Sequence, residues 1–234
     1  MKFRACCGPA PAASPIAASA GALAIAVATS APQRTRRAAA GTQGDAGDDD
    51  TRYAVLTVGH STRPIEAFVD LLRGHDVTRL IDVRTVPRSR HNPQFATDAL
   101  AASMQSAGIG YAHVAGLGGF RRPLADSPNA GWRNLSFRGY ADYMQTPAFR
   151  AELDHLIELA AHARLALMCA EAVPWRCHRS LIADALLARG VASAEIASAT
   201  RLQRHRLTRF ARIDGDRVTY PADAAAAIEP TSGA

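Results

Sequence analysis

The segment MCAEAVPWRCHR, residues 168–179, holds two cysteines, a glutamate, a histidine and two arginines. These residue types permit covalent chemistry, because a thiolate is a strong nucleophile and a nearby carboxylate or imidazole transfers protons. Cys169, Glu171, Cys177 and His178 are therefore candidate catalytic residues. Either Glu171 or His178 would serve as the acid/base group.

The two thiols are expected to differ in acidity and burial. Cys177 precedes a predicted helix, and a helix N-terminus with His178 and Arg179 beside it lowers the pKa of a thiol. Cys169 follows the apolar run LALM, so we expect it to be the more buried of the two. Because nucleophiles of α/β enzymes often end a strand, Cys169 is the expected nucleophile if the chemistry is covalent.

Three other interpretations of the cysteines stay open. The pattern partly resembles that of zinc deaminases, but Pro174 is not followed by a cysteine. A redox pair is a second interpretation, although the spacing is not C-x-x-C. Both thiols could instead be small core residues, with an Arg–Glu pair holding the loop. A phosphatase loop is excluded, since six residues rather than five separate Cys169 from Arg176. We predict neither a metal nor a cofactor.

Patterns typical of strands and helices alternate along the chain from residue 53. The expected strands are residues 53–61, 78–86, 109–114, 164–171 and 192–198, and the expected helices are residues 61–76, 97–108, 139–163 and 177–190. The third helix is either continuous or broken near Pro147. A hairpin turning at Asp214–Gly215 is expected near the C-terminus. The alternation predicts an α/β fold: a three-layer Rossmann-like domain with a mostly parallel sheet of about five strands.

Polar residues follow each predicted strand, where open α/β sheets bind their ligands. Segments far apart in the sequence thus deliver polar groups to one edge of the sheet. The expected ligand-binding residues are His60, Ser61, Arg84, Arg88, Arg121, Arg122 and Arg179.

The chain of 234 residues is basic, with a formal net charge of +6, and Lys2 is its only lysine. A Schiff-base lysine and a phosphate-loop lysine are therefore excluded from the globular part. Arginine must bind any anionic ligand, and its planar guanidinium suits phosphate or carboxylate.

Residues 1–51 are rich in Ala, Gly, Pro and Ser, and they end in an acidic run. This composition predicts a disordered tail, a targeting segment or an over-extended gene start. Residues 52–221 are expected to form a single α/β domain, and residues 222–234 a disordered C-terminal tail. With two cysteines in the domain and no apolar run that could span a bilayer, we expect a cytoplasmic protein without a membrane partner.

The motifs TVGHSTR, DVRTVPRSRHNPQF, GLGGFRRP, GWRNLSFRGYADYM and MCAEAVPWRCHRSLIADAL together resemble the bacterial family called domain of unknown function 488. The resemblance covers about residues 53–221. It implies an α/β domain whose motif residues gather at one site, and it implies no substrate. The motif residues are His60, Ser61, Arg84, Cys169, Glu171, Cys177, His178 and Arg179.

We therefore expect an enzyme, or an enzyme-like binder, that acts on a small anionic or phosphorylated ligand. A nucleotide or a component of nucleic acid is the favoured class, because arginines and a helix N-terminus suit phosphate. One alternative is a non-catalytic nucleic-acid-binding module, supported by the basic segment LQRHRLTRFAR. A thiol redox or sensor protein is the other. The sequence leaves the oligomeric state open.

Overall fold

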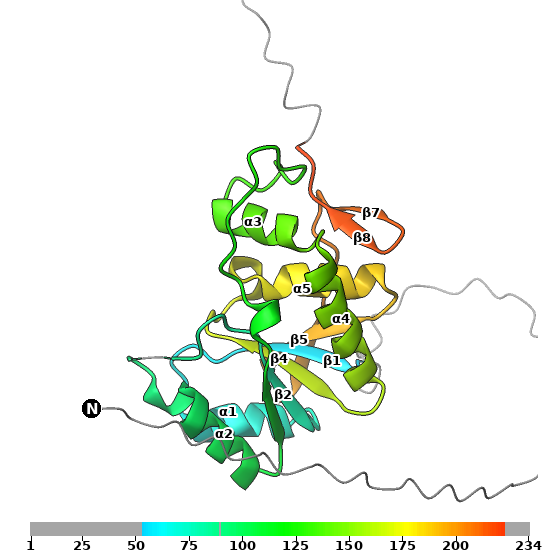
Figure 1. Ribbon diagram of the computed structural model, residues 1–234. Coiled ribbons are helices and arrows are strands. Elements are labelled where there is room, and N and C mark those ends of the chain that lie inside the picture. Colours follow the sequence, from blue (N-terminus) through cyan, green and yellow to red (C-terminus); the bar gives the residue numbers. More distant parts are fainter. Residues whose placement is uncertain (1–52, 89, 223–234) are drawn as a thin grey trace, which may run out of the picture. The chain divides into compact units, whose positions relative to one another are not determined.

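The computed structural model describes residues 53–88 and 90–222. They form a six-stranded sheet, a two-stranded hairpin and five α-helices (Figure 1). In chain order the elements are β1 (Val55–Gly59), α1 (Ile65–Arg73), β2 (Arg79–Asp82), α2 (Thr97–Ser106), β3 (Gly110–His113), α3 (Leu135–Tyr143), α4 (Pro147–Ala160), β4 (Leu165–Cys169), α5 (Arg179–Ala188), β5 (Ser193–Ser198), β6 (Arg201–Arg204), β7 (Arg212–Asp214) and β8 (Arg217–Thr219).

The strand order of the sheet is β3-β2-β4-β1-β5-β6, and all neighbouring strands are parallel except β5 and β6. The central strands are in register at their carboxyl ends. Gly59 of β1 pairs with Cys169 of β4, and Asp82 of β2 pairs with Met168. The residues that follow these three strands therefore emerge side by side.

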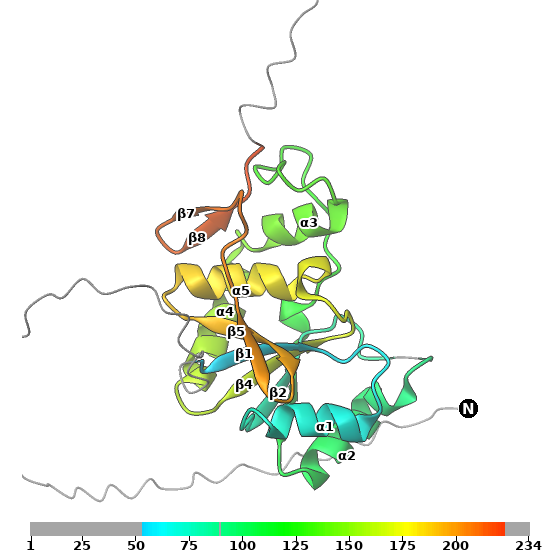
Figure 2. The ribbon, with the colours of Figure 1, turned by 180° about the vertical axis from the view of Figure 1, so that it is seen from behind.

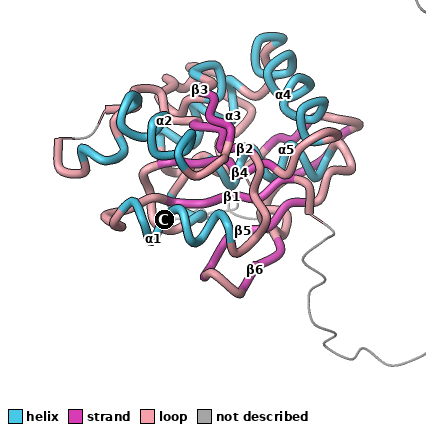
Figure 3. Tube along the Cα trace, turned by 90° about the horizontal axis from the view of Figure 1, so that it is seen from below, coloured by secondary structure: helices cyan, strands magenta, loops and turns pink. Residues whose placement is uncertain are grey.

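Helices cover both faces of the sheet, which gives three layers (Figures 1 and 2). On one face α1 and α2 bury Phe68, Leu72 and Leu100 against the sheet. On the other face α4 and α5 bury Leu153 and Leu181. Successive strand residues alternate between these two cores, because side chains in a strand point to opposite faces. Figure 3 shows β3 and β6 at opposite ends of the sheet.

Two buried carboxylates hold the long connections on the α5 side. Asp142 of α3 accepts hydrogen bonds from Ser127, Asn129 and the backbone of Leu124, which fixes the irregular stretch before α3. Asp184 of α5 accepts from the Tyr220 hydroxyl at 2.8 Å, and its other oxygen contacts His205.

The structure confirms the α/β class and the mostly parallel sheet, with six strands rather than about five. The antiparallel edge strand β6 is an addition that its polar sequence did not predict. Residues 139–163 form two helices, since α4 begins at Pro147. The hairpin turns one residue later than expected, at Gly215–Asp216. The expectations for residues 1–51 and 222–234 fall outside the described residues, except at residue 222.

No helix among the described residues combines the length and the apolar character needed to cross a membrane.

Candidate active site

A cleft of about 680 Å³ opens at the carboxyl edge of the sheet. The segments after β1, β2, β3 and β4 contribute to it, as does the N-terminus of α3. Its lining includes His60, Ser61, Arg84, Thr85, Arg88, Asn92, Phe120, Asn134, Phe137, Cys169, Glu171, Arg176, Cys177 and His178.

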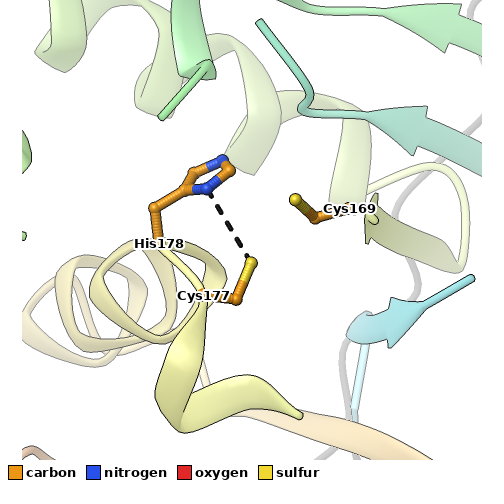
Figure 4. A group of neighbouring side chains, drawn as sticks. All are labelled: Cys169, Cys177 and His178. Atoms are coloured by element: carbon orange, nitrogen blue, oxygen red, sulfur yellow. Dashed lines mark hydrogen bonds between the residues drawn. The ribbon is translucent and has the colours of Figure 1, made fainter. Parts of the chain in front are cut away.

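Cys177 lies at the bottom of this cleft, just before α5. Its sulfur accepts a hydrogen bond from Arg179 Nε at 3.3 Å, and it lies 3.8 Å from His178 Nδ1. The donor atoms of Cys169, Cys177 and His178 all lie within 4.8 Å of one another (Figure 4). Three potential proton donors therefore face one buried sulfur atom.

The backbone carbonyl of Val83, the residue directly after β2, fixes the tautomer of His178. Its Nε2 lies 3.0 Å from the carbonyl oxygen of Val83. Because a carbonyl can only accept, Nε2 carries a proton, and Nδ1 is the nitrogen that shares a proton with the Cys177 sulfur. Gly119 packs against the same ring, where a Cβ would lie 2.6 Å from Nδ1. The arrangement is that of a cysteine–histidine pair with an oriented imidazole.

The two thiols have opposite acidities. The hydrogen bond with Cys169, followed by His178 and Arg179, holds the pKa of the Cys177 thiol well below its ordinary value, although burial opposes this. The same hydrogen bond to Cys177, together with burial, raises the pKa of Cys169. Cys177 is therefore the more acidic thiol and the one that carries an anion, and Cys169 is the thiol that donates to it.

The sequence predicted the greater acidity of Cys177, but its expectation about burial was wrong. The exposed fraction is 8% for Cys169 and 2% for Cys177. The apolar run of β4 does end at Cys169. However, the loop after it and the start of α5 close over Cys177 more completely.

Arg179 is fully buried and holds Cys177 from behind. Its Nη1 pairs with Glu195 of β5 at 3.4 Å, and its Nη2 donates to the carbonyl of Glu171 at 2.8 Å. Glu195 also accepts a hydrogen bond from the hydroxyl of Thr57. A buried cation must be compensated, and here the compensation comes from a carboxylate and a sulfur together.

A second buried group stands on the opposite wall of the cleft. Arg84 makes a bidentate pair with Asp82, through Nε at 2.9 Å and Nη2 at 2.6 Å. Its Nη1 lies 3.4 Å from Nε2 of His60. The other His60 nitrogen, Nδ1, is 2.8 Å from the carbonyl of Ser61, so it carries the proton. Burial and Arg84 lower the pKa of His60 to about 4, and the ring is neutral at pH 7.

The backbone at this edge is closely packed. A Cβ at Gly59 would lie 2.0 Å from the carbonyl oxygen of Glu171. Ser61 has a φ of 50°, a left-handed conformation that is uncommon for serine. Close approach of the loops after β1 and β4 thus brings His60 and Ser61 to the same cleft as the cysteines.

The structure places eight of the eleven predicted site residues around this cleft: His60, Ser61, Arg84, Arg88, Cys169, Glu171, Cys177 and His178. Arg121, Arg122 and Arg179 are absent from the described residues that line it. The Arg121 guanidinium lies 4.0 Å from the centre of the Tyr143 ring, and Arg122 is exposed elsewhere. Arg179 acts on the sulfur rather than on the cleft.

Sequence reasoning missed Arg176, Asn134 and Glu195. Arg176 lies within the quoted segment, yet its role at the rim depends on the short 3-10 helix η4 (Pro174–Arg176). Asn134 caps α3 through its side chain, which the pattern Asn before an apolar run can indicate. Glu195 had one signal, a single carboxylate inside the apolar strand pattern ASAEIAS.

Cys169, Cys177 and His178 also form the group that could hold a transition metal among the described residues. Two thiolates and an imidazole suit zinc. The guanidinium of Arg179 already balances the charge of the Cys177 sulfur at 3.3 Å. A metal bound here would share the Cys177 sulfur with Arg179.

Fold and site together define an α/β protein with a buried Cys–His–Arg cluster at the carboxyl edge of its sheet. The family model described as domain of unknown function DUF488 matches residues 64–186, and the chain belongs to this family. The match is shorter than the range of about 53–221 expected from the motifs. No curated protein and no solved structure matches the chain.

Proposed function

We propose that this protein is a cytoplasmic enzyme that uses the Cys177 thiolate, rather than the Cys169 expected from the sequence, as a nucleophile on a small anionic or phosphorylated ligand. The contact between Arg179 Nε and the Cys177 sulfur is the observation that carries the proposal. A buried arginine aimed at a thiol is costly for a purely structural role, because small apolar residues would fill this space without burying charge.

The charges around the cleft support an anionic ligand. Arg88 and Arg176 line the cleft and are exposed, and the buried Arg84 also lines it. Glu171 is the single acidic side chain among the described residues lining the cleft. Phosphate-bearing ligands suit paired arginines, and a nucleotide or a component of nucleic acid remains our favoured class.

The proposed reaction follows from the protonation states. The Cys177 sulfur attacks an electrophilic phosphorus or carbon of the ligand, and the leaving group departs with the electron pair of its bond. His178 has accepted the proton of the Cys177 thiol and is an imidazolium, and it gives this proton to the leaving group. Neutral His178 then deprotonates a water molecule that attacks the adduct, and the sulfur leaves as a thiolate.

Alkylation with a charged and a neutral reagent tests this proposal. In a chain with Cys6→Ser and Cys7→Ser, the rates with iodoacetate and iodoacetamide are compared with those of a free thiol. We expect Cys177 to favour iodoacetate relative to the free thiol by about fivefold, because rim arginines attract the anion. Its reaction should also stay fast below pH 7, where the free thiol slows.

Two double variants separate the cleft arginines from general charge. Arg88→Gln with Arg176→Gln should abolish the preference for iodoacetate. Arg121→Gln with Arg122→Gln, which removes equal charge outside the cleft lining, should preserve it. If the parent chain has the same ratio of iodoacetate to iodoacetamide rates as a free thiol, the proposal of an anionic ligand is wrong. Fast alkylation that survives Cys177→Ser and disappears with Cys169→Ser would overturn the assignment of the nucleophile.

Close approach of the two sulfurs favours a thiol redox protein as the second candidate. A peroxide would oxidise the Cys177 thiolate to a sulfenic acid, releasing hydroxide, and the Cys169 thiol would then displace water to form a disulfide. The intact mass would fall by two hydrogen atoms. Retention of both free thiols in excess peroxide would exclude this candidate.

A further inference from the structure

A second cleft, also of about 680 Å³, lies on the far side of η4 from the cysteine cleft. We call it the Trp175 groove; its lining includes Trp175, Leu202, Arg204, His205, Arg206 and Thr208. The segment η4 separates the two clefts, since Arg176 lines the cysteine cleft while Pro174 and Trp175 line the groove. Arg179 and Glu195 belong to its lining as well, so the groove lies directly behind Cys177.

Positive charge gathers along the groove and beside it. Arg204 and Arg206 line it and are exposed, and Arg201 and Arg209 are exposed on either side of them in the chain. None of these four arginines forms an ion pair within residues 53–88 and 90–222. Glu195 is the single acid among the described lining residues, and Arg179 and Thr57 already engage it.

Trp175 is a large aromatic side chain whose placement has no packing explanation. It is 68% exposed, although a tryptophan normally buries most of its surface. The other tryptophan of the chain, Trp132, packs against Phe137, Phe210 and Tyr220. An exposed indole in a groove that arginines also line provides a flat face on which a nucleobase can stack.

We propose that the Trp175 groove binds a single-stranded nucleic acid, with a base stacked on Trp175 and phosphates on Arg204 and Arg206. The inference rests on the proposed function, because it names the substrate class of the same protein. A strand crossing η4 would place one nucleotide at Cys177 while its neighbours lie in the groove. Nucleic acid fits better than an acidic peptide, since stacking and spaced phosphates match the aromatic and the arginines together.

Fluorescence anisotropy of labelled oligonucleotides tests the inference on the full chain. Twelve-residue oligothymidylate and oligouridylate serve as probes, with polyglutamate as competitor. We expect binding that weakens as salt rises, with Trp175→Ala reducing affinity about tenfold and Trp175→Phe restoring much of it. Arg204→Gln with Arg206→Gln should lower the salt slope by about 0.7 for each arginine.

The matched control is Arg212→Gln with Arg217→Gln, which removes the same charge from the β7–β8 hairpin. The inference is overturned if this control weakens binding as much as the groove variant does. It is also overturned if polyglutamate competes as well as unlabelled oligonucleotide, which would indicate an acidic protein partner. Absence of binding at low salt would also overturn the inference. The arginines of β6 would then serve to prevent this edge strand from pairing with another chain.

Failure of this inference and failure of the proposed function give different results. Cys177→Ser should still bind the oligonucleotides, with equal or slightly higher affinity, because the groove does not need the sulfur and loses only a nearby negative charge. The iodoacetate comparison contains no nucleic acid, so it can succeed when the anisotropy titration shows nothing. Conversely, oligonucleotide binding with a slow, unselective Cys177 would support the groove and contradict the enzyme.

Discussion

His60 and His178 each have one ring nitrogen fixed by a backbone carbonyl, yet the two imidazoles do different work. In His178 the free nitrogen faces a sulfur, so a proton can move between them. In His60 the free nitrogen faces the guanidinium of Arg84, which cannot accept a proton. Burial disfavours a charged ring, and protonating His60 would also place a second cation beside Arg84, so the pKa of His60 falls to about 4.

This difference predicts an acid-sensitive component of stability. The His60 pKa is about 6.5 in the unfolded chain and about 4 in the folded one. As pH falls from 6.5 towards 4, the unfolded state takes up a proton that the folded state refuses. Stability is therefore lost across this window, by at most about 1.4 kcal/mol per pH unit. Above pH 6.5 the residue contributes no pH dependence.

Urea unfolding at pH 7 and pH 5 measures the effect. His60→Gln, which keeps an acceptor for Arg84, should lose less stability between the two pH values than the parent. His155→Gln changes an exposed histidine of α4 and should leave the loss unaltered. Equal losses in all three chains would show that His60 does not cause the acid sensitivity.

At the scale of elements, several glycines set how closely the site segments approach. Gly119 contacts the His178 ring, and Gly59 contacts the backbone of Glu171. In the sequence, GLGGFRRP is a glycine-rich motif shared with the family that the chain resembles. What the sequence could not show is that the third glycine of this loop leaves room for an imidazole contributed by α5.

Gly119→Ala should impair Cys177 while leaving the fold largely intact. The new Cβ would lie 2.6 Å from His178 Nδ1, so the ring must move away from the sulfur. We expect alkylation of Cys177 at pH 7 to slow about tenfold, because a thiol loses one of the groups that stabilise its anion. The measurement is the alkylation rate against pH.

Gly110→Ala is the matched control for this variant. Its Cβ would meet the flexible side chain of Arg79 at 3.3 Å, far from the thiols. Its alkylation profile should equal that of the parent. The role given to Gly119 is wrong if both variants behave alike.

Periodicity predicted the strands and helices well where local and tertiary preferences agree. β1 and β4 are continuous apolar runs, and α1 has one clear apolar face, so each was predictable from its own residues. β6 was not, because its sequence RLQR is polar and its pairing with β5 depends on the rest of the sheet. Likewise, the sequence predicted that His60, Arg84 and Cys169 lie at one edge of the sheet. It could not predict that Glu195 pairs with Arg179, because this depends on β5 lying beside β1.

At the scale of the whole described unit, the sheet divides two cores with different relations to the site. The core on the α5 side includes Cys169 and Cys177 themselves. The core on the α1 and α2 side contains neither thiol. Loss of packing in the core on the α5 side should therefore alter the reactivity of Cys177 more than loss of packing in the core on the α1 and α2 side.

Leu181→Ala and Leu72→Ala test this asymmetry, since both side chains are fully buried. Each should lower the free energy of unfolding by about 2–5 kcal/mol. Leu181→Ala should also alter the alkylation profile of Cys177, while Leu72→Ala should leave it unchanged in the folded protein. Urea denaturation and alkylation in dilute buffer measure the two effects. Identical profiles for the two variants would contradict the division.

The single guanidinium of Arg179 serves a sulfur on one side and the Glu195 carboxylate on the other. Alkylating Cys177 with a neutral reagent turns its anionic sulfur into a neutral thioether, and Glu195 is then the single anionic partner of the Arg179 guanidinium. Because Glu195 lines the Trp175 groove, the potential there becomes more positive without any backbone movement. Modification of Cys177 would thus raise the affinity of the groove for phosphate, and a bound strand would dissociate most slowly while the adduct persists.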